Sequence, residues 1–239
     1  MREKGERVKQ LRIVLLIGAL LVSGSVTLPV QASEDPTFSA AFAVRVIAAL
    51  TESYVGSLVE TMHTLSATNE LRSGTWDEMV DLISAFEESV LTFDAWFLQP
   101  DGVYYKVGTG LQAGNLSDRS YFSTVMAGEA TLGDLVHSRS TGRKSMVLTV
   151  PIIAGEHVIG ALGVTLYLEE LGALIADAIR LPSTVSFYAT GQDGLIALYP
   201  SDAQMLLEPG SEAEMGVVSG GIQISPSLGW TFVLGTPAE

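Results

Sequence analysis

A long stripe of apolar residues at helical spacing is the first pattern that the sequence shows. Between residues 36 and 71, apolar side chains recur every three or four positions, as on a helix that packs one face on a core. Pro36 suits the first turn of a helix, and Ser73 with Gly74 ends the pattern. The sequence therefore predicts one long amphipathic helix over residues 36–71. Its apolar positions are Phe42, Val46, Ala49, Leu50, Val55, Leu58, Met62 and Leu65.

A second helix is predicted directly after this break. Residues 75–78 (Thr-Trp-Asp-Glu) have the form of a capping box, in which Thr75 and Glu78 bond the free backbone N–H groups of a helix start. Apolar residues with helical spacing follow it, at Met79, Leu82, Ile83, Phe86 and Val90.

The rest of the chain has the pattern of antiparallel strands joined by turns. Asp101 and Gly102 form the turn of a hairpin over residues 92–107, and residues 108–118 are expected to be a polar loop. Asp118 can cap a short helix that follows it. We expect helices over residues 119–127 and 169–179, and further strands at 133–139, 145–153, 157–167, 183–189, 195–199, 216–224 and 230–234.

These elements predict an α+β fold. A long N-terminal helix packs on an antiparallel sheet, and a helix-bearing loop is inserted between the hairpins of that sheet. Residues 33–239 show no second linker and no internal repeat, so we expect them to form a single domain.

Residues 1–32 have the pattern of a secretory signal peptide. Five basic residues precede the apolar run 13–22, and small residues then lead to Val30-Gln31-Ala32. The run is shorter than the roughly 20 apolar residues of a spanning helix. We expect cleavage after Ala32, with an uncleaved N-terminal anchor as the alternative. Either outcome places residues 33–239 outside the cytoplasm, in the periplasm or the extracellular space.

The charge of the chain excludes one class of function. Without residues 1–32, 8 basic and 25 acidic residues remain, a net charge of −17. No basic stripe is present that could displace the counterions of a nucleic acid, so no nucleic-acid partner is expected. The same charge disfavours docking on an anionic membrane.

No motif of an enzyme or a metal protein is present. The absence of cysteine excludes thiolate catalysis and thiolate metal sites. His63, His137 and His157 are widely separated, and neither His-Glu-x-x-His nor Gly-x-Ser-x-Gly occurs. Residues 140–145 depart from a phosphate loop because Arg143 stands where that loop has its lysine. We therefore expect no catalysis, no metal and no cofactor.

An ordered set of short motifs lies between residues 115 and 164. They are residues 115–122 (Asn-Leu-Ser-Asp-Arg-Ser-Tyr-Phe), 127–129 (Ala-Gly-Glu), 138–143 (Ser-Arg-Ser-Thr-Gly-Arg), 150–152 (Val-Pro-Ile) and 158–164 (Val-Ile-Gly-Ala-Leu-Gly-Val). This set resembles the Cache domain, a PAS-like extracellular sensor module of chemoreceptors and sensor kinases. With the long helix and residues 229–233, the resemblance covers about residues 36–236. It implies a PAS-like sheet with a short helix that covers a ligand pocket.

The resemblance places the candidate binding residues in and after that short helix. Arg119 can hold a carboxylate through two parallel hydrogen bonds, and the helix start offers free N–H groups to an anion. Tyr121 and Phe122 can form an apolar wall, and His137 can donate to a carboxylate. The other candidates are Ser138, Arg139 as a second cation, and Thr165. Alternative roles stay open: an ion pair with Asp118 or a loop carboxylate for Arg119, a place in the core for the aromatic residues, an exposed strand position for His137, and a tight turn for residues 138–143.

One departure from the family narrows the ligand. Amino-acid receptors similar to this chain carry an Asp in the later Gly-rich strand, which takes the ammonium group of the ligand. Thr165 stands there, and Gly114 replaces a Tyr that precedes the Arg of those receptors. A buried ammonium group without an anion costs several kcal/mol. We therefore expect a small organic acid, a mono- or dicarboxylate, with an amino acid as the alternative.

The expected partner is a separate membrane protein. Most Cache domains signal through a membrane helix into a cytoplasmic output domain, and we expect no output domain within this chain. We expect a membrane-bound signalling or transport partner. As an alternative, the domain is an adaptor whose long helix docks on a kinase, chemoreceptor or transporter without a ligand. The same helix could form a homodimer.

Overall fold

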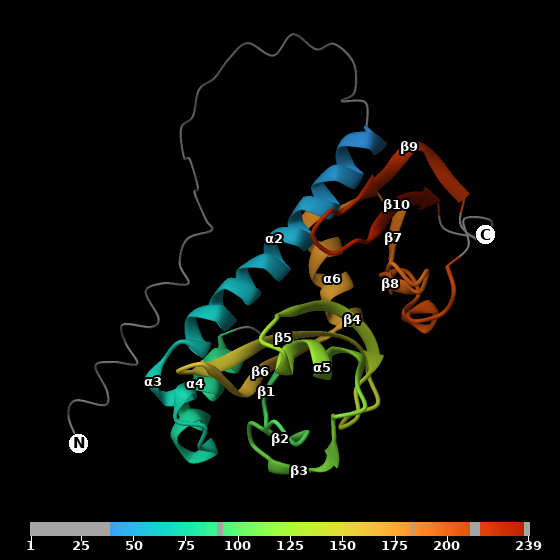
Figure 1. Cartoon of the computed structure of the whole chain (residues 1–239). Helices are drawn as coiled ribbons and strands as arrows, with labels where there is room; N and C mark the ends of the chain where they lie inside the picture. Colours follow the sequence, from blue (N-terminus) through green and yellow to red (C-terminus); the bar gives the residue numbers. More distant parts are fainter. Residues whose placement is uncertain (1–38, 90–92, 183, 211–215, 237–239) are drawn as a thin grey trace, which may run out of the picture. The chain divides into compact units, whose positions relative to one another are not determined.

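The strands of the described residues form two antiparallel sheets (Figure 1). The structure, a computed structural model, describes residues 39–89, 93–182, 184–210 and 216–236. The larger sheet has the order β3-β2-β1-β6-β5-β4 and the smaller one β8-β7-β10-β9. The strands are β1 (Phe93–Leu98), β2 (Val103–Lys106), β3 (Gly110–Asn115), β4 (Thr131–His137), β5 (Lys144–Ala154), β6 (His157–Tyr167), β7 (Ser186–Thr190), β8 (Ile196–Leu198), β9 (Gly216–Ile224) and β10 (Thr231–Thr236).

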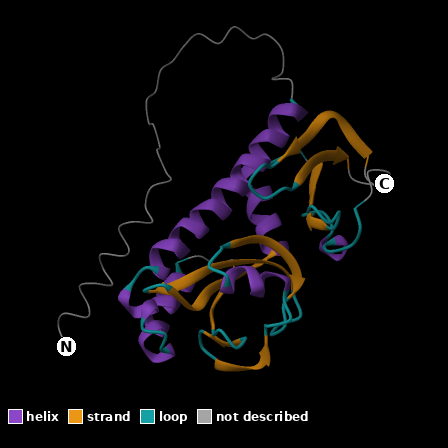
Figure 2. Ribbon diagram, viewed as in Figure 1, coloured by secondary structure: helices purple, strands orange, loops and turns teal. Residues whose placement is uncertain are grey.

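The predicted long helix is confirmed as α2 (Ala40–Ser66), which contacts strands of both sheets (Figure 2). Ser39 caps it through a hydrogen bond from the Phe42 N–H to Oγ. Its buried stripe packs on β5 of the larger sheet and on β9 and β10 of the smaller one. The turn after it is a separate helix, α3 (Asn69–Arg72), because Thr68 accepts from the Leu71 N–H and starts a new cap. The expected start at Pro36 lies outside the described residues.

Length and hydropathy would allow α2 to cross a membrane. In the structure, however, one face of α2 is buried against the sheets, with Ile47 and Met62 fully inaccessible. Glu52 also bonds outside the helix: its carboxylate accepts from the hydroxyls of Ser225 and Ser227, at 2.5 and 2.9 Å. These bonds lower the pKa of Glu52, the bond from Ser225 most, because they stabilise its charge. Here α2 acts as the core helix of the fold.

Two local expectations were wrong. Helix α4 (Trp76–Glu88) begins where expected, but Thr75 makes no side-chain cap bond to it. Its hydroxyl is directed back to the Ser73 carbonyl instead. Residues 110–115 form an edge strand, β3, rather than a loop. Because β3 is half exposed and contains glycine, its sequence lacks strand periodicity, and its pairing with β2 stabilises it.

The single expected sheet is divided in the structure. The class, α+β with a long first helix, is confirmed. Strand β6 ends at Tyr167 and passes directly into helix α6 (Leu168–Ile179), so the later strands pair among themselves. The boundary between residues 32 and 33 stays a prediction, because residues 1–38 lie outside the described part.

Gly163 on β6 allows the indole ring of Trp96 to lie flat across the sheet. The two residues are opposite each other in the β1–β6 register. A methyl group on Gly163 would lie 2.3 Å from the ring of Trp96, well inside contact distance. The ring has little freedom to move, since its Nε1 donates to Thr165 Oγ1 at 2.8 Å.

We predict that Gly163→Ala destabilises the protein by about 1–3 kcal/mol, the usual cost of overpacking a core. Gly56→Ala is the matched control, because Gly56 lies on the exposed side of α2 with no atom within 4 Å of an added methyl group. In a helix, the exchange of Gly for Ala should increase the free energy of unfolding by at most about 1 kcal/mol. Urea unfolding of both variants measures the two effects. Equal stability of the two variants would contradict the packing described.

Candidate ligand-binding site

A small cavity lies between the larger sheet and helix α5 (Ser120–Met126). Side chains from β1, β2, β6, α5 and the turn after β4 meet around it. Its volume is about 30 Å³, room for about one or two water molecules. Its apolar wall is Trp96, Tyr104, Leu116, Tyr121, Val136 and Val147, and its polar wall is Lys106, Arg119, Ser138, Arg139, Ser140 and Thr165.

Three aromatic rings form the floor of the cavity. Trp96 packs edge-on against Tyr104 and tilted against Tyr121, with ring centroids 6.3 and 6.1 Å apart. All three are buried. Burial raises the pKa of both tyrosines above its usual range, because a phenolate there would lose its water. Both hydroxyls therefore stay protonated and remain hydrogen-bond donors at neutral pH.

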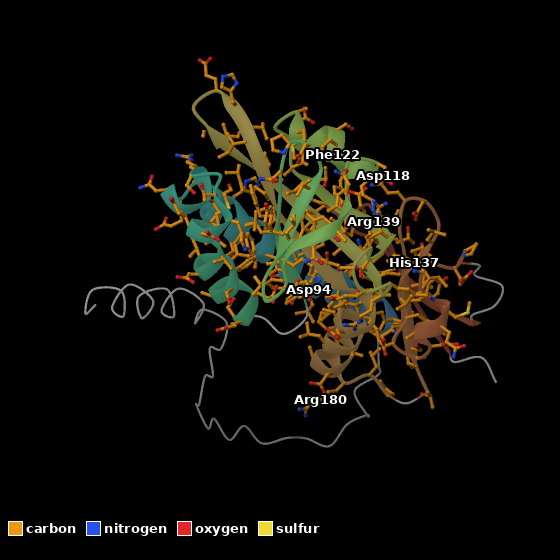
Figure 3. All side chains as sticks on the ribbon, turned by 90° about the horizontal axis from the view of Figure 1, so that it is seen from below. Asp94, Asp118, Phe122, His137, Arg139 and Arg180 are labelled. Carbon is orange, nitrogen blue, oxygen red and sulfur yellow. The ribbon has the colours of Figure 1, made fainter. Side chains whose placement is uncertain are left out.

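Arg139 forms an ion pair with Asp118. Its Nη2 lies 2.8 Å from Asp118 Oδ2, and its Nη1 donates to the Asn115 carbonyl. Figure 3 shows Asp118 and Arg139 next to each other. The hydrogen bond from Arg139 lowers the pKa of Asp118. The expected N-cap role of Asp118 is wrong: α5 begins after Arg119 without a side-chain cap, because the Asp118 carboxylate is bound to Arg139.

Arg119 contacts the cavity without a carboxylate partner in the described part of the chain. Its Nη2 donates to the His137 carbonyl at 3.1 Å, and it is half-buried. The considered ion pair with Asp118 does not form. A guanidinium has five N–H donors, so one bond to a neutral carbonyl leaves donors and the whole charge for a ligand.

Lys106 and Asp94 form a second ion pair beside the cavity. Lys106 Nζ lies 2.5 Å from Asp94 Oδ2 and donates to Ser140 Oγ at 3.1 Å. The Tyr167 hydroxyl donates to the same carboxylate oxygen of Asp94. Burial, with this hydrogen bond as the next cause, raises the pKa of Tyr167 to about 12. The Arg143 guanidinium lies 3.6 Å above the Tyr167 ring.

The structure brings five of the seven predicted site residues together. Arg119, Tyr121, Ser138, Arg139 and Thr165 line the cavity; whether they bind a ligand stays a prediction.

Two of the seven predicted residues lie outside the cavity wall. Phe122 packs against the aromatic cluster from outside, and His137 is exposed and contributes only its carbonyl, to Arg119. Sequence reasoning missed Trp96, Tyr104 and Lys106. The hairpin was recognised, and its alternating strand positions could have placed these three on one face.

Comparison with known proteins supports the fold. No family model matches the chain, and no curated protein matches its sequence. Solved structures do match, at low identity. The sensory domain of the Campylobacter jejuni chemoreceptor Tlp3, with isoleucine bound, is 10% identical over 82% of this chain and 90% of that one, with a TM-score of 0.61.

Two Pseudomonas domains match similarly. The ligand-binding domain of the P. fluorescens chemoreceptor CtaA, with L-serine, is 13% identical over 80% of this chain and 92% of that one, with a TM-score of 0.64. The ligand-binding domain of the P. aeruginosa amino-acid chemoreceptor PctB, with L-arginine, is 16% identical over 80% of this chain and 91% of that one, with a TM-score of 0.65. This chain therefore has the fold of Cache-type sensory domains, as the motifs at residues 115–164 implied.

The Tyr167–Asp94 contact predicts a pH dependence. An unfolded tyrosine has its ordinary pKa of about 10, whereas folded Tyr167 has one of about 12. Between these values only the unfolded chain releases the proton, so the stability that Tyr167 contributes is present below pH 10 and is lost as pH rises toward 12. The stability difference between wild type and Tyr167→Phe should therefore be smaller at pH 11 than at pH 8 in urea unfolding. A constant difference would contradict the contact.

Proposed function

We propose that this chain is an extracytoplasmic sensor domain that binds a small organic acid in the cavity beside Arg119. The observation that carries the proposal is the half-buried guanidinium of Arg119, which faces the cavity and has a neutral carbonyl as its protein partner. A planar guanidinium matches a carboxylate through two parallel hydrogen bonds. Binding rather than catalysis is the activity that such a wall supports.

The charges around the cavity favour a ligand with one negative charge. Lys106, Arg119 and Arg139 line it, while Asp94 and Asp118 each neutralise one of these cations. One positive charge remains, that of Arg119, and a monocarboxylate would balance it. A dicarboxylate would need Arg139 to leave Asp118. An α-amino acid would bring an ammonium group, and the described residues that line the cavity include no carboxylate to receive it.

The small volume of the cavity implies that binding includes a movement. Ligand pockets usually measure about 300 Å³ or more, ten times the space present here. The Arg139–Asp118 pair is largely exposed and joins the turn after β4 to the start of α5. Such a surface pair adds little to stability, so α5 and this turn can separate to admit the ligand.

The solved relatives support ligand sensing and also the amino-acid alternative. They are chemoreceptor domains, and three of them hold isoleucine, L-serine or L-arginine. At 10–16% identity, their ligands do not identify the ligand of this chain. The paired state of Asp94 and Asp118 is the reason that we favour an acid without an amino group.

A ligand-independent adaptor is the second candidate. The observation that favours it is the nearly filled cavity, which would need no occupant. In both cases we propose an exported domain that reports to a membrane-bound signalling or transport partner. The signal-peptide pattern of residues 1–32, cleaved or kept as an anchor, supports this location.

A thermal-shift screen of the purified full chain against short organic acids tests the proposal. A ligand at a concentration of about a hundred times its dissociation constant adds about 2.7 kcal/mol to the free energy of unfolding. For a chain of this size, this raises the melting temperature by about 5–11 °C. Arg119→Ala should abolish the shift. Arg72→Ala is the control, since Arg72 is exposed on α3, and it should keep the shift. Absence of a shift with every acid would favour the adaptor.

A further inference from the structure

We infer that the ammonium group of Lys106 occupies the place in which an amino-acid ligand would put its own, and that Lys106 thereby selects acids without an amino group. The inference rests on the proposed function, because it concerns the same cavity. It makes Lys106 a specificity-determining residue, distinct from Arg119, which holds the carboxylate.

The strand register places Asp94 beside the cavity. Asp94 and Trp96 are two positions apart on β1, so their side chains lie on the same face of the sheet. Trp96 lines the cavity, and Asp94 is directly opposite Thr165, which also lines it. Lys106 is opposite Trp96 on β2, and its side chain reaches diagonally across to Asp94. Asp94 is therefore the carboxylate one step from the floor of the cavity.

The bonds of Lys106 are those that an ammonium ligand would make. An ammonium group has three donors and no acceptor. Lys106 Nζ donates to the Asp94 carboxylate and to the Ser140 hydroxyl, with side-chain exposures of 13% for Lys106 and 24% for Asp94. The low exposure means that this carboxylate needs a cation close to it. The protein supplies that cation itself.

This arrangement acts against a zwitterion. With the carboxylate of an amino acid held by Arg119, its ammonium group would approach the charged Lys106 rather than an open carboxylate. Two ammonium groups repel, and both would lose water. An acid of the same shape without the amino group meets no such opposition. The selection therefore works through repulsion as well as through attraction.

Removal of the Lys106 ammonium group should reverse the selection. In Lys106→Ala, Asp94 would keep its bond from the Tyr167 hydroxyl but lose its cation. Glu87 lies near the same point, bonded to the Ala95 N–H at 2.6 Å, and its charge interacts with Asp94. The site would then have excess negative charge and more space. The ammonium group of an amino acid would fit into this space and balance the charge.

Two ligands that differ only in the amino group provide the test: 3-methylbutanoate and L-valine. Isothermal titration of the full-length wild type should detect the acid at least tenfold more tightly than L-valine. Lys106→Ala should gain at least tenfold in affinity for L-valine. The double variant Lys106→Ala/Asp94→Asn should lose that gain, because its anion has been removed. Lys106→Met, which keeps the length of the side chain without its charge, replaces the alanine variant if that variant does not melt cooperatively.

The outcomes separate this inference from the proposed function. If wild type binds the acid and Lys106→Ala gains no L-valine affinity, the role of Lys106 is refuted and the proposed function stands. If wild type already binds L-valine as tightly as the variant, the role of Lys106 is refuted as well. If wild type does not bind the acid but the variant binds L-valine in an Asp94-dependent way, the role of Lys106 stands and the organic-acid proposal is overturned. Binding of neither ligand by either protein overturns both.

Discussion

The buried face of α2 supplies the core surface that each sheet lacks on one side. A sheet needs another layer over its apolar face, and one helix provides it here for β5 of the larger sheet and for β9 and β10 of the smaller one. The polar positions of α2 contribute as well, since Glu52 holds the loop between β9 and β10 through two serine hydroxyls. The cavity depends on this packing, because the opposite face of the larger sheet is thereby left to α5 and the turn after β4.

On that opposite face, polar side chains are organised as pairs. Asp94 and Asp118 are each paired with one cation, and Trp96 is fixed by its bond to Thr165. The half-buried Lys106–Asp94 pair holds its geometry, because separation would leave a half-buried charge without a partner. The Arg139–Asp118 pair is largely exposed and can open. Arg119 differs from Lys106 and Arg139 because, among the described residues, its partner is a carbonyl and not a carboxylate. The site is therefore rigid at Lys106 and Trp96 and adaptable at α5.

The sequence allowed prediction of much of the fold and part of the site. The helices α2, α4 and α6 and the long strands β5 and β6 follow from periodicity, because local spacing determines which face of each is buried. Arg119 and Tyr121 were found because they lie within one motif. Lys106 and Asp94 were not, because the hairpin was predicted without its register, and the register brings the two side chains together. The division into two sheets was missed for a similar reason. Contacts distant in sequence determine which strands pair, and helix α6 separates the strands of the larger sheet from those of the smaller one along the chain.

The position of Tyr167 connects its bond with Asp94 to helix α6. It is the last residue of β6 and the N-cap of α6, the helix that leads from the larger sheet to the smaller one. The guanidinium of Arg143 lies over the ring of Tyr167 and forms an ion pair with Glu170 on α6. A rearrangement at Lys106 would therefore alter the anchorage of the joint that connects the two sheets. Under the proposed function, a ligand in the cavity would act through Asp94 and Tyr167 on the first turn of α6, which links the two sheets.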